Sequence, residues 1–299
     1  MLQSHSFHRA GDAAHSFPPT GGLGLNSGLG DVHNLAFKIA AVHQNWAGPS
    51  ILDTYQADRR QVALVNAKQS VKNGLQIFGL LKTLGTTDKD ISIAKKNLYH
   101  RLTDPKSRLE VMKGIEAQRE HFCNIGLHIG YIYGDNEVPV TASLYVPSYR
   151  PGARLPHSWL SRAPNHDVTQ LPPIDNSYVS EFSTATLEKK RYSTLDLCAH
   201  DAFTLMFSSE FATHWTDILA ALPKRLPKRA VPSLKINAAA LGRDFELAPG
   251  ARGDEWLMGM QLDHGAAVLV RPDQHILSCH VKGAGVDEVS QRLVDFLGL

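Results

Sequence analysis

Residues 11–34 combine one carboxylate with a high density of glycine, and these residue types in this order could bind a ligand. Asp12 follows Gly11, and a carboxylate at the end of a strand can accept hydrogen bonds from sugar-like hydroxyl groups. The glycines that follow allow main-chain amides to approach a ligand closely, while Pro18 and its neighbour oppose regular structure. We therefore predict a binding loop with Asp12 at a sheet edge.

A helix is expected to begin near Gly28, after the N-capping type Asn26, and to run to about His43. Its unpaired N–H groups and positive dipole end would face the loop. This arrangement favours an anionic or electron-accepting ring, and a phosphate group would also satisfy it. Glycine-rich loops also precede helices that bind nothing, so spacing alone leaves a purely structural role open. The G-x-G within the loop is not a dinucleotide fingerprint, because two prolines stand where a buried strand should be.

Other residues capable of chemistry give weaker signals. His15 lies three residues after Asp12 and could tune a ligand's charge or move a proton, or it could order the loop through a hydrogen bond. Arg59 and Arg60 are expected to cap the second helix or tie it to Asp53 rather than bind a cofactor. The histidines show no metal-ligand spacing, so we predict no metal site. No residue is assigned as a catalytic base.

The composition restricts the partners and the compartment. The chain has 299 residues, of which 43% are hydrophobic and 20% charged, which is typical of a globular protein. With 31 basic and 29 acidic residues and no dense basic block, we expect no nucleic-acid partner. The three cysteines form no C-x-x-C pair, and no apolar run reaches the roughly 18 residues of a membrane span. We therefore expect a cytoplasmic protein without membrane association or dithiol chemistry.

The elements after the binding loop are expected to be helical at first. Ser50 can cap a long helix over residues 51–84, which Gly74 should bend or interrupt. A third helical stretch is predicted at residues 104–122. Prolines and glycines in residues 131–173 predict irregular connections between sheet elements.

The last part of the chain, residues 186–299, has the element order of a thioredoxin-like α/β sandwich. Four charges in residues 187–192 indicate an exposed crossing, so we place a domain boundary near residue 185. The pattern predicts two closely spaced strand segments, a helix, a strand, a short helix, a hairpin that turns at Asp273 and Gln274, and a final amphipathic helix. These elements are expected within residues 193–209, 214–226, 231–241, 256–262, 265–281 and 286–299.

The sequence from residue 11 to 42, GDAAHSFPPTGGLGLNSGLGDVHNLAFKIAAV, resembles the second FAD-contact motif and following helix of class A flavoprotein monooxygenases. ILDTY at residues 51–55 and the Asp58-Arg59-Arg60 run continue this resemblance. PGARLPHSWL, STLDL and GAAVLVRPDQHI resemble landmarks of the phenol hydroxylase branch, whose members add a thioredoxin-like domain without redox cysteines. The resemblance implies an α/β (α+β) fold, with the C-terminal portion of a flavin monooxygenase FAD domain in residues 1–185 and a thioredoxin-like domain in residues 186–299.

The resemblance also implies roles for single residues. Asp12, next to Gly11, would hold the ribityl chain of FAD, and Pro18 with its neighbours would border the isoalloxazine ring. The helix dipole would stabilise negative charge on the reduced ring. The residues expected to turn amides toward the pyrimidine edge of the flavin are Gly22, Gly24, Leu25 and Asn26.

The implied function is hydroxylation of a phenolic or other small aromatic substrate with O2 and NAD(P)H, in particular NADPH. FAD would supply the oxygen chemistry, while protein groups position the ring and exclude water. Gln61 departs from the family, whose members often carry proline after the paired arginines. In the family, the G-x-G-x-x-G for the ADP half of FAD and most of the substrate pocket precede the position of Asp12, and this sequence contains neither.

Two other classes of function stay open. The chain could be a non-catalytic remnant or partner protein, folded around its thioredoxin-like end, that associates as a homodimer or with a complementing chain. A thiol oxidoreductase would require an exposed thiol of low pKa, and the cysteine spacing disfavours it. The first 180 residues are expected to be marginally stable alone, because unburied helix faces cost about 25 cal/mol per Å².

Overall fold

The computed structural model describes residues 3–4, 7–134, 139, 141–161 and 174–299. Its contacts form two compact units that alternate along the chain. Unit 1 comprises Met1–Val32, Asp58–Tyr131 and Asn136–Val146, and unit 2 comprises His33–Ala57, Ile132–Asp135 and Pro147–Leu299. The domain boundary near residue 185 stays a prediction.

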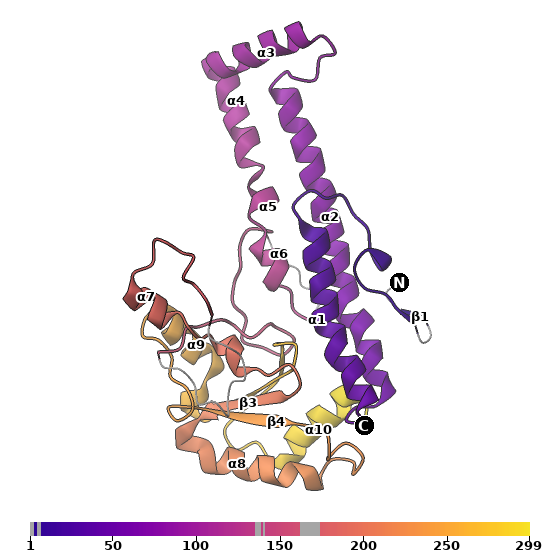
Figure 1. Ribbon diagram of the computed structural model, residues 1–299, viewed down its shortest axis with the longest axis vertical. Coiled ribbons are helices and arrows are strands. Elements are labelled where there is room, and N and C mark those ends of the chain that lie inside the picture. Colours follow the sequence, from indigo (N-terminus) through magenta and orange to yellow (C-terminus); the bar gives the residue numbers. More distant parts are fainter. Residues whose placement is uncertain (1–2, 5–6, 135–138, 140, 162–173) are drawn as a thin grey trace. The chain divides into compact units, whose positions relative to one another are not determined.

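Unit 1 is largely helical, and two of its helices continue into unit 2 (Figure 1). Its elements are β1 Gln3–Ser4, β2 Phe7–His8, the 3-10 turn η1 Gly11–Ala13, α1 Leu23–His43, α2 Asp53–Thr83, α3 Ile91–Thr103, α4 Pro105–Glu116, α5 Arg119–Phe122 and α6 Ile125–Ile129. The predicted third helical stretch is confirmed as α4 and α5, and Asp104 caps α4 by accepting from the Ser107 N–H at 2.8 Å. Helix α3 was not predicted.

Two expectations for the long helices were wrong. Helix α1 begins at Leu23, five residues before Gly28, so the second half of the glycine-rich stretch is helical. Helix α2 continues through Gly74 without interruption. Both helices continue through their glycines, because buried contacts offset the free-energy cost of roughly 1 kcal/mol that each glycine imposes within a helix. Leu23, for example, is fully buried with Leu127 and Ala142.

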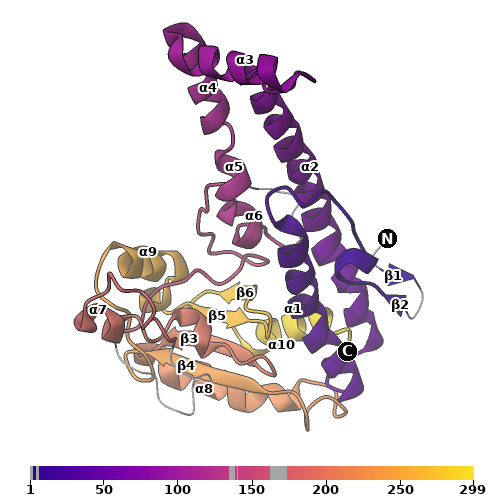
Figure 2. The same ribbon diagram turned by 45° about the horizontal axis from the view of Figure 1, so that its top comes forward.

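Unit 2 contains a four-stranded sheet of order β4-β3-β5-β6 (Figure 2). Strand β3 is parallel to β4 and antiparallel to β5, and β5 is antiparallel to β6. Its further elements are η2 Pro49–Leu52, α7 Thr184–Lys189, η3 Thr194–Leu197, β3 Phe203–Ser208, η4 Ser209–Phe211, α8 Ala212–Ala221, η5 Leu222–Lys224, β4 Ile236–Leu241, α9 Ala251–Met260, η6 Leu262–His264, β5 Ala267–Val270, β6 Ile276–His280 and α10 Val286–Leu297.

Alternating side chains of the sheet build two buried cores. Phe203, Leu205 and Phe207 of β3 face α8 and α10, together with Phe37 and other residues of α1. Met206, on the opposite face, joins the core that contains α9. The α/β fold class is therefore confirmed.

The predicted order of elements in this unit holds except at its start. Residues 194–197 form the 3-10 turn η3 rather than a strand, because Ser193 and Asp196 make a reciprocal capping box that bends the chain. The hairpin turns at Asp273 and Gln274 as predicted, and the Gln274 N–H donates to the Arg271 carbonyl at 2.9 Å.

The predicted irregular stretch at residues 131–173 lies partly outside the described residues. Its described part forms isolated bridges, such as Trp159 with Ser193 and Leu160 with Leu247. Among the helices that the structure describes, none has both the length and the apolar content required to cross a membrane.

Candidate functional site

The predicted carboxylate lies in a tight turn of unit 1. Strand β2 ends at His8, and Asp12 is in η1, so the expectation of a strand that ends directly at Asp12 was wrong. Gly11 has a φ of +56°, a conformation that glycine adopts without strain. Its carbonyl accepts from the N–H groups of Ala14 at 2.8 Å and His15 at 3.0 Å. The turn therefore has a defined shape, and it leaves Asp12 exposed.

The residues predicted to present amides lie together at the beginning of α1. Gly24, Leu25 and Asn26 belong to its first turn, and the backbone N–H groups of Gly24 and Leu25 have no partner within the helix. Gly22 precedes the helix with a φ of +63°, and the Asn26 side chain donates to its carbonyl at 3.0 Å. The positive end of the helix dipole therefore lies at the residues that were predicted to present amides, although the helix begins five residues before the predicted start at Gly28.

Pro18 is exposed in the segment that connects the turn to α1. Ser70, in the middle of α2, donates its hydroxyl to the Pro18 carbonyl, and the Thr20 hydroxyl donates to the Ser70 carbonyl. Asn124 donates to the Gly21 carbonyl at 2.7 Å. Sequence analysis missed Ser70 and Asn124, since their partners lie about 50 and 100 residues away and no local pattern indicates them.

Glycines in α1 allow other parts of unit 1 to approach the helix backbone. A Cβ atom at Gly28 would lie 3.2 Å from the Gly11 Cα, and one at Gly30 would lie 2.7 Å from Arg59 Nη2. A Cβ atom at Gly22 would meet no described atom within 4 Å. The first two glycines thus permit close packing, whereas Gly22 leaves open space beside the first turn of α1.

Sequence analysis also missed the buried carboxylate of Asp31, which lies on α1 one helical turn after Ser27. Asp31 accepts hydrogen bonds from the Gly11 N–H at 3.1 Å, from His15 Nε2 at 2.7 Å and from Arg59 Nε at 2.9 Å. Arg59 thus binds Asp31, a partner that the sequence analysis did not name, and Arg60 is exposed. The available signal was the polar pair Ser27 and Asp31, spaced as if on one buried helix face.

The arrangement fits the ribityl and pyrimidine parts of a flavin. An exposed carboxylate can accept from the ribityl hydroxyl groups, and free amides at a helix N-terminus suit the electron-rich edge of the ring. The open space at Gly22 would allow a ring to approach the backbone. Residues Asp12, Gly22, Gly24, Leu25 and Asn26 would be the contacts, and their assignment to FAD stays a prediction.

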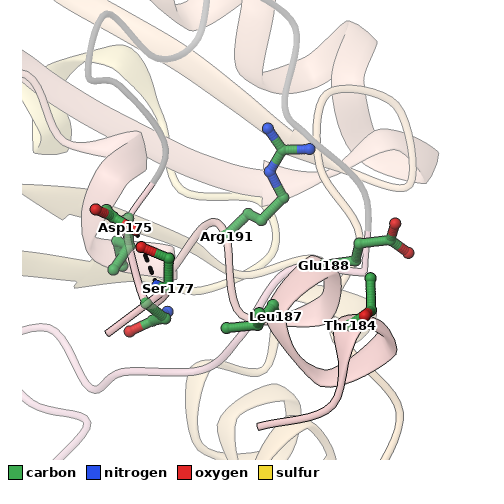
Figure 3. Close-up of a pocket in the computed structure, with 8 residues that line it drawn as sticks. Asp175, Ser177, Thr184, Leu187, Glu188 and Arg191 are labelled. Atoms are coloured by element: carbon green, nitrogen blue, oxygen red, sulfur yellow. Dashed lines mark hydrogen bonds between the residues drawn. The ribbon is translucent and has the colours of Figure 1, made fainter. Parts of the chain in front are cut away.

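A separate cavity lies in unit 2 between residues 174–177 and the region of α7 (Figure 3). It has a volume of about 350 Å³, and none of the residues predicted for the site lines it. Asp175 accepts from the Ser177 N–H at 2.9 Å, and hydrogen bonds from the Ser177 side chain and from this N–H hold the pKa of the Asp175 carboxyl below its usual value. The polar groups of this cavity thus partly satisfy one another.

The cysteines do not support thiol chemistry. Burial raises the pKa of the Cys198 thiol to about 12, which keeps the thiol protonated at neutral pH. Cys123 and Cys279 are exposed, free and in different units. A thiol oxidoreductase would instead need an exposed thiol of low pKa.

Comparison with known proteins supports the FAD interpretation. The family model of the FAD binding domain matches residues 6–70, which include η1, the first turn of α1 and Arg59. Phenol 2-monooxygenase of Pseudomonas sp. (strain EST1001) is 28% identical over 284 residues, which cover 89% of this chain and 41% of that protein. 2,4-Dichlorophenol 6-monooxygenase of Cupriavidus pinatubonensis is 29% identical over 290 residues, 92% of this chain and 43% of that protein.

A solved structure shares the fold. The crystal structure of the flavin-dependent monooxygenase PieE in complex with FAD and substrate matches 99% of this chain and 48% of that chain, with a TM-score of 0.75 and 23% sequence identity. The chain spans less than half the length of these relatives. The chain is therefore similar to FAD-dependent aromatic monooxygenases, and the match to the FAD binding domain covers the segment that carries the predicted flavin-contact motif.

Proposed function

We propose that this chain contributes the flavin-facing part of an FAD-dependent monooxygenase that hydroxylates a phenol-like aromatic ring with O2 and NADPH. One observation carries the proposal. The segment matched by the FAD binding domain model contains both the exposed Asp12 and the free N-terminus of α1, the two features that suit a flavin.

Each group has a role in binding or electrostatics. Asp12 accepts hydrogen bonds from ribityl hydroxyl groups, and the amides of Gly24 and Leu25, with Asn26 beside them, face the pyrimidine edge of the ring. The dipole of α1 favours the extra negative charge that the ring carries after reduction. Pro18 borders the ring and helps to exclude water. When bound, FAD supplies the oxygen chemistry, and no described side chain is assigned as a catalytic base.

The remaining contacts must come from polypeptide beyond the matched segment, because the relatives are more than twice as long as their matched regions. Leu25, Leu29 and Val32 form an apolar stripe on α1, and more than half of each side chain is exposed. Covering such a stripe with further polypeptide would stabilise unit 1, at about 25 cal/mol per Å² of apolar surface. A complementing chain or a second copy could supply this cover in the working enzyme.

Spectroscopy of the purified chain with added FAD tests the proposal. We expect a flavin spectrum that stays with the protein through gel filtration. Replacing Asp12 with Ala should weaken FAD binding roughly tenfold or more, since a hydrogen bond to a charged group contributes about 1.5–3 kcal/mol. The control is Asp217→Ala at an exposed position of α8, which should bind FAD as the wild type does.

Two further outcomes decide between the hypotheses. Protein that stays colourless with excess FAD would contradict the proposal and favour a non-catalytic remnant or partner protein. If the flavin binds, anaerobic addition of NADPH with phenol, in the presence of the polypeptide that supplies the remaining contacts, should bleach its visible absorption, and an unchanged spectrum would contradict the NADPH assignment.

A further inference from the structure

Asp31 is the centre of a buried polar cluster in unit 1 that consists of Asp31, His15 and Arg59. The exposed fractions of these side chains are 0%, 8% and 2%. A buried carboxylate is costly unless donors surround it, and here three donors do so: the Gly11 N–H, His15 Nε2 and Arg59 Nε. Two of them belong to the turn that carries Asp12.

The cluster fixes both peptide groups of Gly11. Asp31 accepts from the Gly11 N–H, while the Gly11 carbonyl accepts from the N–H groups of Ala14 and His15. His15 is itself bound to Asp31 through its side chain, so the turn is attached to the carboxylate at both ends. Asp12 lies between these attachments, and the backbone that carries its carboxylate therefore cannot rotate freely.

Arg59 holds the carboxylate from the other side. It donates to Asp31 through Nε and to the Ser27 carbonyl through Nη2 at 3.1 Å, and its guanidinium lies 5.1 Å from the centre of the Tyr131 ring. The guanidinium passes directly over Gly30, where any Cβ atom would clash with it. A lysine cannot make the same pair of directed bonds.

We infer that Asp31, Arg59 and His15 are positioning residues for the flavin site, which hold the turn at Gly11 so that Asp12 presents its carboxylate to the ribityl chain. This inference rests on the proposed function, because it gives Asp12 its ligand. The cluster does not touch the flavin in this role and acts only through the turn. Its effect should therefore depend on Asp12 and on the ribityl chain.

Hydrogen exchange of the ligand-free chain tests the attachment itself. We expect the backbone amides of residues 11–15 to exchange at least tenfold faster in Asp31→Asn, which removes the negative charge that the Gly11 N–H and His15 bind, and in Arg59→Lys, which removes the directed bond that fixes the carboxylate. The matched control is Arg60→Lys, the exposed neighbour on α2, which should exchange as the wild type does. Unchanged exchange of residues 11–15 in both variants would overturn the inference, whether or not FAD binds.

A double-mutant cycle with FAD then separates positioning from a general structural role. Asp31→Asn should weaken FAD binding roughly tenfold in the wild-type background and have no further effect in the Asp12→Ala background. Binding of lumiflavin, which has the ring but no ribityl chain, should be unchanged by Asp31→Asn. Additive losses, or an equal loss for lumiflavin, would overturn the positioning role.

Failure of the proposed function has a different signature. If the wild-type chain takes up neither FAD nor lumiflavin, the proposed function is contradicted, and the exchange experiment alone decides whether the cluster holds the turn. If the wild type binds FAD and the variants bind it equally well, the proposed function stands and the positioning role is wrong.

Discussion

Two buried carboxylates occur at successive turns of α1, Asp31 as a residue of the helix and Asp273 as a partner of Asn34, and their surroundings differ. Asp31 belongs to unit 1 and binds Arg59, whereas Asp273 belongs to unit 2 and binds Arg271. Asp273 also accepts from the side chain of Asn34, one turn after Asp31, at 3.0 Å. The same chemistry, an arginine on a buried aspartate, therefore occurs in both units.

The groups packed against the two arginine–aspartate pairs differ. Aromatic rings surround Arg271: Phe296 at 4.7 Å, Tyr133 at 5.1 Å and Phe37 at 5.7 Å from its guanidinium carbon. The Arg59 guanidinium has one such ring, Tyr131 at 5.1 Å, and the Asp31 cluster otherwise has glycine backbone against it and an exposed apolar stripe on the same helix. The cluster at Asp273 thus lies in a closed core, and the one at Asp31 lies beneath a turn whose Asp12 is exposed.

The largest expected effect is the loss of the closed cluster. Replacing Asp273 with Ala leaves the buried Arg271 without its carboxylate and should cost about 3–5 kcal/mol of unfolding free energy. Urea unfolding followed by tryptophan fluorescence measures this, since Trp215 and Trp256 are both buried in unit 2. Asp263→Ala, which removes an exposed partner of His264, should change stability by less than about 0.5 kcal/mol. A loss below about 1 kcal/mol for Asp273→Ala would show that the rings alone hold Arg271.

The pH dependence of folding stability should show that His275 is buried in the same closed core. Burial lowers the pKa of His275 to about 3, so the folded state keeps this ring neutral while the unfolded chain protonates it below about pH 6.5. The unfolded state then binds more protons, and stability falls as the pH falls, by about 2 kcal/mol between about pH 6.5 and pH 5.

Urea titrations at both pH values test this contribution. His275→Asn should lose about 2 kcal/mol less than the wild type over that interval, whereas His264→Asn, at an exposed position, should lose as much as the wild type. Equal losses in the wild type and His275→Asn would mean that water reaches the ring.

The last prediction compares two glycines inside helices, Gly79 in α2 and Gly30 in α1. Alanine normally stabilises a helix by about 1 kcal/mol relative to glycine, and Gly79→Ala in α2 should do so because its Cβ meets no described atom within 4 Å. Gly30→Ala should instead destabilise the chain by about 1–3 kcal/mol, since the new methyl group overlaps the Arg59 guanidinium. Thermal unfolding of both variants measures whether each substitution raises or lowers the melting temperature. Stabilisation by Gly30→Ala would show that the Asp31 cluster adapts easily.

Features that depend on local spacing could be predicted from the amino-acid sequence. Hydrophobic periodicity and turn residues located the strands and helices of unit 2 after residue 202, including the turn at Gln274. The Gly11–Asp12 corner and the helix that follows it were also predicted from residue types. These patterns are readable because neighbouring residues create them.

Which residues bond to one another across long separations could not be predicted from the sequence and follows from the folded arrangement. Arg59 meets Asp31 across 28 positions, and Asn34 meets Asp273 across 239. The same packing extended α1 back to Leu23 through glycines whose local preference opposes a helix. Buried polar groups require partners, and the choice of partner depends on which surfaces the folded chain brings together.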